Sequence, residues 1–235
     1  MSESITSYER LWDDYAKHWD QLDKPGQPRY LGDEWGSLQE NQRLFDEFLK
    51  PWLTPQATVV EIGPGGGKYT VMTAPHVERL ISIDVSSEML RRTQERIDEE
   101  ALANVELIKG NGLDLSSVPD HSADVVFSFD VFVHLAPADT YAYMREMRRI
   151  LKPGGVGSLT LANILSPDGF QKFINEVDLH RQQRGAEQFG YLTPTIASRF
   201  LFSLGYSIVG YSDEINNRDF AVVFRNDSDA GLSCS

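Results

Sequence analysis

The sequence predicts an α/β protein with a mostly parallel sheet that is covered by helices on both faces. Short apolar segments alternate with helical patterns from residue 58 onward, and the length of 235 residues suits one α/β domain with an added segment. A glycine-rich turn follows the first apolar segment in "VVEIGPGGGKYT", residues 59–70. Ligands bind such sheets beyond the carboxyl ends of the strands, so this turn marks the expected ligand site.

Seven segments are predicted to be strands, because each is short, apolar or β-branched, and followed by polar or glycine-containing residues. They cover residues 58–63, 79–86, 104–112, 123–130, 156–163, 206–214 and 218–225.

Helical spacing of apolar residues predicts the helices between and before these strands. They cover residues 7–22, 37–53, 68–77, 86–101, 137–155 and 193–205. In the predicted helix over residues 86–101, a serine is available as N-cap, and Met89, Thr93 and Ile97 share one face. In the fifth, Pro137 suits the first turn.

The pattern divides the chain into segments with different expected roles. We expect a helical lid over residues 1–52, a core over residues 53–226 with a substrate-side insertion at residues 164–194, and a disordered tail over residues 227–235.

Composition narrows the expected partners and location. A formal net charge of −13 disfavours binding to nucleic-acid backbones. The single cysteine, Cys234, cannot form an internal disulfide, and no Cys/His spacing suggests zinc, so no metal is expected. No signal peptide and no apolar segment long enough to span a membrane are visible, so we expect a cytoplasmic protein without membrane contact.

The glycine turn, taken alone, fits more than one ligand. Gly63, Gly65 and Gly67 resemble a dinucleotide turn, but Lys68 stands where that pattern needs glycine or alanine, and no Gly-Lys-Ser/Thr follows for a phosphate loop. Asp84, at the end of the second strand, could accept hydrogen bonds from both ribose hydroxyls of NAD or of another adenosine cofactor.

Several motifs together resemble the class I S-adenosylmethionine (SAM)-dependent methyltransferases, especially their small-molecule branch. "VVEIGPGGGKYT" looks like the family's first motif and "ISIDVSSEML" like its second; "VELIKGNGLDL", "SADVVFSFDVFVHL", "ILKPGGVGSLT" and the N-terminal "WDDYAKHWD" follow the same order. The resemblance covers roughly residues 12–225 and implies a Rossmann-like fold with SAM as cofactor.

The resemblance also implies which residues would contact SAM. Glu61 would lie near the cationic end of the cofactor, Asp84 would bind the ribose, and Asn111 would reach the adenine. The other expected cofactor-binding residues are Gly63, Gly65, Gly67, Val85, Met89, Gly112, Leu113, Ser128 and Phe129.

Catalysis and acceptor recognition are expected to involve other residues. His134 follows the fourth strand and is the expected general base, with Asp130 as the alternative base or substrate ligand. Arg181 and Arg184 could meet an anionic acceptor, but the sequence favours solvated surface positions for both. The expected lid or substrate residues are Trp12, Tyr15, Trp19, Tyr30 and Trp35.

The sequence therefore predicts an enzyme that transfers a methyl group from SAM to an oxygen or nitrogen of a small molecule, such as a natural product, sugar or aromatic metabolite. The alternatives are a SAM-binding accessory protein without catalysis and a nicotinamide-dependent oxidoreductase. The oligomeric state does not follow from the sequence.

Overall fold

The computed structural model describes residues 7–19, 28–182, 189–213 and 215–227. The strands are β1 (Thr58–Ile62), β2 (Arg79–Asp84), β3 (Val105–Lys109), β4 (Ala123–Ser128), β5 (Leu151–Ala162), β6 (Tyr206–Ser212) and β7 (Asp219–Asn226). The α-helices are α1 (Ser7–Trp19), α2 (Leu38–Phe48), α3 (Lys68–Thr73), α4 (Ser87–Glu99), α5 (Pro137–Ile150), α6 (Pro167–Gln182) and α7 (Pro194–Ser203). Short 3-10 turns are η1 (Lys50–Trp52), η2 (Ala74–His76) and η3 (Phe132–His134).

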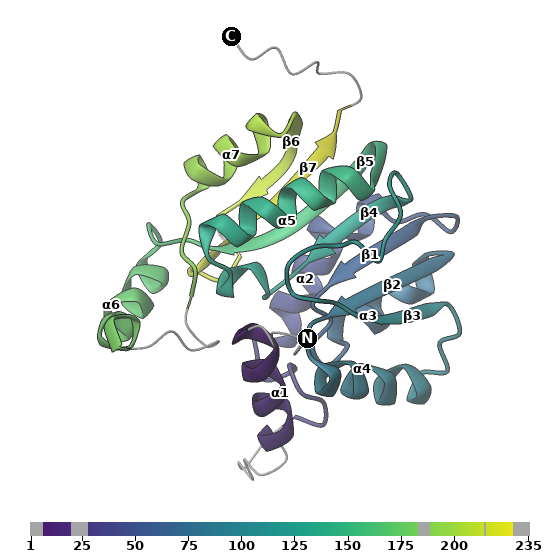
Figure 1. The fold of residues 1–235 in the computed structure, drawn as a ribbon, viewed down its shortest axis with the longest axis horizontal. Helices are drawn as coiled ribbons and strands as arrows, with labels where there is room; N and C mark the ends of the chain where they lie inside the picture. Colours follow the sequence, from purple (N-terminus) through teal and green to yellow (C-terminus); the bar gives the residue numbers. More distant parts are fainter. Residues whose placement is uncertain (1–6, 20–27, 183–188, 214, 228–235) are drawn as a thin grey trace, which may run out of the picture.

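The strands form one seven-stranded sheet in the order β3-β2-β1-β4-β5-β7-β6 (Figure 1). The first five strands along the chain pair in parallel, whereas β7 is antiparallel to both β5 and β6. The order reverses between β1 and β4, so a crevice opens at the carboxyl ends of these two strands. The predicted α/β, Rossmann-like fold is confirmed.

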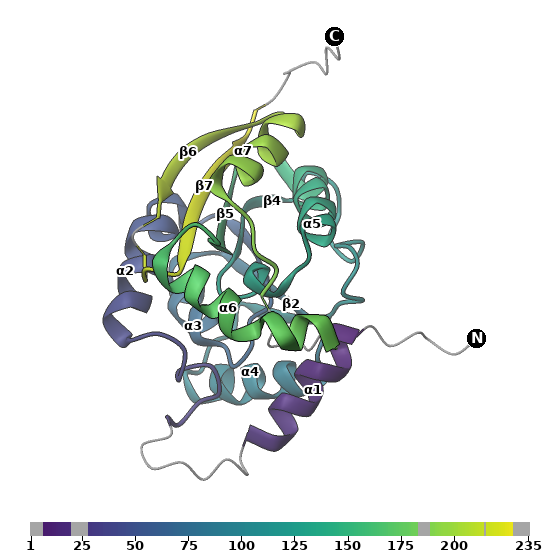
Figure 2. The same cartoon turned by 90° about the vertical axis from the view of Figure 1, so that its left-hand side faces the viewer.

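Helices cover both faces of the sheet because strand residues alternate between the two sides. Val59 of β1 packs with Leu44 and Phe45 of α2 on one face. Val60, the next residue, packs with Met147 of α5 and Leu201 of α7 on the other. Figures 1 and 2 show α5 and α7 on the side opposite to α2 and α3.

The predicted helix over residues 137–155 is shorter than expected. It ends at Ile150, and Leu151 begins β5. Pro153 explains the difference, because a proline disfavours helical geometry in the residue before it and lacks the N–H that a helix interior needs. The "LKPGG" segment is therefore the start of the strand.

The two N-terminal helices have different positions. α2 packs into the core through Leu44, Phe45 and Phe48, so it belongs to a layer of the domain. α1 instead lies beside α4 at the open end of the sheet (Figure 1). The Oδ1 atom of Asp13 accepts hydrogen bonds from Ser86 Oγ at 2.5 Å and Glu88 N at 3.2 Å, which fastens α1 to the beginning of α4.

The expected lid boundary at residue 52 stays a prediction, and α1 is the described helix that lies over the crevice. The predicted disordered tail, residues 227–235, lies outside the described residues except for Asp227. Among the helices that the structure describes, none is long and apolar enough to cross a membrane.

The packing of α7 against the sheet generates a stability prediction. Leu201 is fully buried in the core, so Leu201→Ala should lower the free energy of unfolding by about 2–5 kcal/mol. Leu38→Ala is the matched control, because the Leu38 side chain is 84% exposed. Urea denaturation of both variants measures the difference, and equal stability of the two would contradict this packing.

Candidate active site

A cavity of about 1040 Å³, including its opening, lies at the carboxyl ends of β1, β2 and β4. Its wall combines the glycine turn, the ends of these strands, and residues from α1 and the segment before α2. The predicted residues that line it are Trp12, Trp35, Gly63, Gly65, Asp84, Val85, Met89, Gly112, Phe129, Asp130 and His134.

The glycine turn forms one side of the cavity. Gly65 has a φ of +57°, and a Cβ atom built there meets no atom within 4 Å, so a side chain at this position would project into free space. At Gly66, a Cβ atom would lie 1.8 Å from the carbonyl oxygen of Leu31, because the backbone before α2 passes directly over the turn. The turn is thus closely packed against the backbone at Leu31, whereas at Gly65 it is open toward the cavity. Gly67 lies at the start of α3 and does not line it.

Asp84 lies at the end of β2 with its carboxylate in the cavity wall. Its Oδ1 accepts a hydrogen bond from Ser86 N at 2.8 Å, and its Oδ2 accepts one from Gly65 N at 3.3 Å. Burial raises the pKa of Asp84 to about 6, and the nearby charge of Asp13 adds to this effect. The carboxylate is therefore oriented, desolvated and ready to accept further hydrogen bonds from a ligand.

The predicted adenine region is only partly at the cavity. Val85, Met89 and Gly112 line it. Asn111 does not, because its side chain closes its own turn: Oδ1 accepts from Leu113 N at 2.8 Å and Asp114 N at 3.0 Å. Leu113 is exposed outside the cavity. Their predicted contacts with the cofactor stay predictions.

Glu61 and Ser128 lie beneath the cavity rather than in its wall. Glu61 Oε2 accepts hydrogen bonds from Thr70 Oγ1 at 2.6 Å and Ser82 Oγ at 2.7 Å, linking β1 to α3 and β2. Burial raises the pKa of Glu61 to about 7 despite these bonds. Ser128 Oγ donates to Ile62 O at 2.6 Å and ties β4 to β1. Both residues thus support the shape of the site from below.

Three consecutive residues directly after β4, namely Phe129, Asp130 and Val131, line the cavity. Phe129 packs edge-on against Tyr69, with ring centroids 5.0 Å apart. Asp130 follows with a φ of +61°, an uncommon conformation for a residue with a side chain, and its N–H donates to Thr160 Oγ1 at 2.8 Å. Burial raises the pKa of Asp130, and the charge of Lys68 offsets part of that rise.

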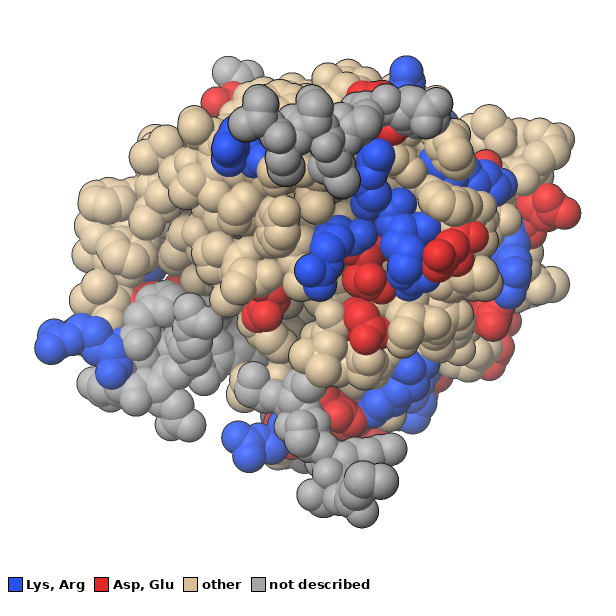
Figure 3. All heavy atoms as spheres, turned by 45° about the horizontal axis from the view of Figure 1, so that its top comes forward, with Lys and Arg blue, Asp and Glu red and all other residues tan. Residues whose placement is uncertain are grey.

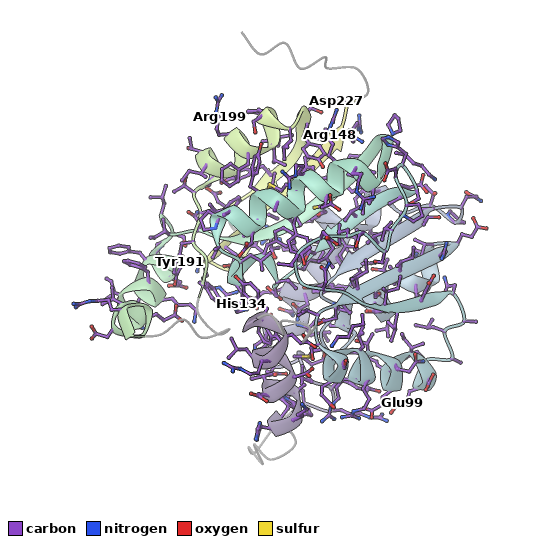
Figure 4. All side chains as sticks on the ribbon, viewed as in Figure 1. Glu99, His134, Arg148, Tyr191, Arg199 and Asp227 are labelled. Atoms are coloured by element: carbon purple, nitrogen blue, oxygen red, sulfur yellow. The ribbon has the colours of Figure 1, made fainter. Side chains whose placement is uncertain are left out.

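His134 ends the short turn η3 and lines the cavity. Its ring lies edge-on to Trp12, with centroids 5.0 Å apart, and edge-on to Phe189, with centroids 5.1 Å apart. Figure 4 shows His134 between the body of the sheet and α1. The imidazole is thus held by aromatic rings on two sides while it faces the cavity.

Two of the five predicted lid residues line the cavity, and the other three do not. Trp12 and Trp35 line the cavity, and the centres of their rings are 6.2 Å apart. Tyr15 and Trp19 lie behind them, where both donate hydrogen bonds to Glu34 Oε1. Tyr30 donates to Glu99 at the far end of α4 (Figure 4 labels Glu99) and lies outside the cavity.

Several residues of the wall were not predicted from the sequence, among them Tyr8, Lys68, Tyr69, Val131, Leu135 and Tyr143. Lys68 was considered only as a departure from the dinucleotide pattern. In the structure its Nζ donates to Trp35 O at 2.7 Å, which ties the segment before α2 to the glycine turn. The signal in the sequence was a lysine directly after the glycine-rich turn. The others come from helices or loops whose approach depends on tertiary packing.

Comparison with known proteins agrees with this geometry. Residues 59–155 match the family described as "Methyltransferase domain". The crystal structure of a SAM-dependent methyltransferase from Aquifex aeolicus superposes with a TM-score of 0.60 at 18% identity, covering 89% of this chain and 97% of that one. Over residues 59–155 the chain is similar to methyltransferase domains, and its fold is that of SAM-dependent methyltransferases. These similarities imply SAM as the cofactor.

Two curated relatives extend the comparison. "Probable methyltransferase ltbC" from Aspergillus luteorubrus is 30% identical over 128 residues, which are 50% of this chain and 45% of that protein. "Demethylmenaquinone methyltransferase" from Listeria welshimeri is 35% identical over 100 residues, 41% of each chain. The matches thus span less than half the length of these relatives.

The residues present fit SAM. Gly65 leaves room at the turn, Asp84 offers a carboxylate, and Val85 and Met89 offer apolar surface for an adenine ring. Within the described residues, no group of three or more His, Cys, Asp or Glu side chains could hold a metal ion.

The open side of Gly65 predicts a steric effect on SAM binding. Gly65→Val should abolish SAM binding, because its side chain would occupy the cavity. Gly154→Val is a matched control: Gly154 also has a positive φ, +81°, and a Cβ there also meets no atom within 4 Å, but it lies outside the cavity. Calorimetric titration with SAM should show loss of binding only for Gly65→Val. Comparable affinity of the two variants would place the ligand elsewhere.

The raised pKa of Asp84 predicts a pH dependence of SAM affinity. Ribose hydroxyls donate to the ionised carboxylate, and protonation removes acceptor capacity, so affinity should fall as the pH drops through about 6. At pH 5 the loss should reach about tenfold relative to pH 8. Asp84→Asn should bind SAM more weakly at pH 8 and should lack this loss below pH 6. An unchanged pH profile in Asp84→Asn would assign the titration to another group.

Proposed function

We propose that the protein transfers a methyl group from SAM to an oxygen or nitrogen atom of a small-molecule acceptor. The observation that carries this proposal is the placement of His134 and Asp130 in the same cavity wall as Gly65 and Asp84. The expected cofactor site and two groups able to accept a proton thus share one cavity.

The chain would position the cofactor through the groups described above. Asp84 would accept the ribose hydroxyls, Val85 and Met89 would contact the adenine, and the backbone at Gly65 would approach the cofactor closely. Bound SAM would supply an electrophilic methyl group on a positively charged sulfur. The protein then has to align an acceptor atom with that methyl group and exclude water.

His134 is suited to remove a proton from an acceptor hydroxyl. An imidazole has an intrinsic pKa near neutrality, so it can accept a proton at physiological pH. The rings of Trp12 and Phe189 hold it from two sides, which limits its rotation and excludes water. Asp130 is the second candidate for this role, because it lines the same wall with a raised pKa.

A small acceptor fits the surroundings of the cavity. Trp12 and Trp35 of the N-terminal segment cover it, which leaves a bounded space for an acceptor. The net charge of −13 disfavours a nucleic-acid acceptor. On the face that Figure 3 shows, Lys and Arg side chains lie beside Asp and Glu side chains. One relative, demethylmenaquinone methyltransferase, is named for a small-molecule acceptor.

Mutation of His134 tests the proposed general base. His134→Ala should lower kcat by about 10²–10⁴-fold while SAM affinity changes little, because His134 contacts the acceptor side of the cavity. His18→Ala is the control, since His18 is exposed on α1 and hydrogen-bonds the carbonyl of Asp14. A His134→Ala enzyme with unchanged turnover would remove His134 as the base.

Binding and turnover together distinguish the alternative functions. A nicotinamide-dependent oxidoreductase would bind NAD in preference to SAM in calorimetric titration. An accessory protein would bind SAM but release no S-adenosylhomocysteine with any member of a panel of hydroxyl and amine acceptors. Binding of SAM with acceptor-dependent formation of S-adenosylhomocysteine is the result expected from the proposed function.

A further inference from the structure

Charged residues continue along the carboxyl edge of the sheet beyond the cavity. Asp219 begins β7 and pairs with Ala162, the last residue of β5. Because β7 is antiparallel to β5, the start of β7 lies at the same edge as Asp84, the glycine turn and Asp130. Arg218 therefore lies at the edge where ligands bind, and β5 separates its strand, β7, from β4, the strand that Asp130 follows.

Arg218 is held in a fixed orientation by a buried partner. Its Nε donates to Asp219 Oδ1 at 2.9 Å and Oδ2 at 3.0 Å, and its Nη2 also donates to Oδ2. Asn216 Nδ2 donates to the same carboxylate at 2.9 Å. The Asp219 side chain is 1% exposed, whereas that of Arg218 is 32% exposed. The carboxylate is thus enclosed, and part of the guanidinium stays accessible.

One aromatic ring connects Arg218 to the catalytic end of the cavity. The guanidinium carbon of Arg218 lies 4.7 Å from the centre of the Phe189 ring, and the His134 ring lies 5.1 Å from that same ring. The centres of the Tyr191 and Phe189 rings are 5.8 Å apart, so Tyr191 extends this aromatic surface. In Figure 4, Tyr191 and His134 both lie toward the left-hand end of the sheet. His134 and Arg218 are therefore separated by about one aromatic ring.

Arg218 lies among charged groups, whereas the surroundings of His134 are mostly apolar. Asp130, Tyr191 and Glu40 lie near enough for Arg218 to affect their ionisation. Lys172 lies 4.4 Å from the centre of the Phe189 ring and is paired with Glu176 at 2.6 Å. Two cations thus contact Phe189, whereas Trp12 and Leu135 give the His134 end an apolar character.

We propose that Arg218 binds the carboxylate of the acceptor, and that the acceptor is a small aromatic acid whose hydroxyl lies at His134. This inference rests on the proposed function and specifies its substrate class. A planar guanidinium presents N–H groups that match a carboxylate, and fixation by Asp219 reduces the entropy lost on binding. Arg181, an arginine that the sequence suggested for this role, is instead exposed on α6, and Arg184 lies outside the described residues.

Two probes that differ in one charge test the proposal. Protein saturated with S-adenosylhomocysteine is titrated with 4-hydroxybenzoate and with its neutral methyl ester. The acid should bind at least about tenfold more tightly than the ester, because only the acid offers a carboxylate to Arg218. Binding of S-adenosylhomocysteine in the same experiment tests the proposed function separately, since its failure would remove the cofactor site and not only Arg218.

Two variants assign the difference to Arg218. Arg218→Lys keeps a cation beside Asp219 but loses the planar fork, and should weaken binding of the acid by about tenfold without affecting the ester. The double variant Arg218→Gln with Asp219→Asn removes both charges together, so that no buried carboxylate is left unpaired, and should abolish the preference for the acid. Arg199→Lys is the control, because Arg199 is exposed on α7, away from His134 (Figure 4).

Three results would overturn the proposal while S-adenosylhomocysteine still binds. These are equal affinity for acid and ester in the wild-type protein, an unchanged preference in both Arg218 variants, and failure of the acid to bind at millimolar concentration. Melting temperatures of the variants near that of the wild type would show that the fold is intact.

Discussion

The architecture of the site depends on one close contact, where the backbone before α2 lies directly on the glycine turn. The carbonyl of Leu31 occupies the place that a Cβ atom of residue 66 would need. The same turn is held from the other side by Thr93 of α4, whose Oγ1 donates to Gly65 O at 2.8 Å. The sheet, α4 and the N-terminal segment therefore contact one another at the glycine turn. A shift of any one of these three elements would disturb the other two, and this constraint fixes the shape of the cavity.

The part of the site that follows directly from strand ends could be predicted from the sequence. Gly65, Asp84 and Phe129 each lie where a parallel strand reaches its carboxyl end, and strand ends can be located from apolar segments. The position of His134 could be predicted in the same way, since it lies shortly after β4. The Rossmann-like fold was predictable for the same reason, because alternating strands and helices leave few topologies.

The other residues could not be located from the sequence because their roles depend on neighbours far along the chain. Asn111 has an amide suited to an adenine, yet the backbone N–H groups of its own turn use its oxygen. Tyr15 and Trp19 share helical spacing with Trp12, but only Trp12 reaches the cavity, since Glu34 holds the other two behind it. Arg218 gains its place from β7 running antiparallel to β5.

The hydrogen bonds that Asp13 accepts from α4 have a consequence for the proton on Asp84. Ser86 connects the two acids, because its N–H donates to Asp84 and its hydroxyl donates to Asp13. With α1 in place, burial and the charge of Asp13 both favour the protonated form of Asp84. A state in which α1 leaves this position would hydrate Asp84 and remove that neighbouring charge, so the pKa of Asp84 would fall and the acid would lose its proton at a lower pH. Movement of α1 and ionisation of Asp84 are therefore linked equilibria, and a rise in pH through about 6 favours the displaced helix in the ligand-free protein.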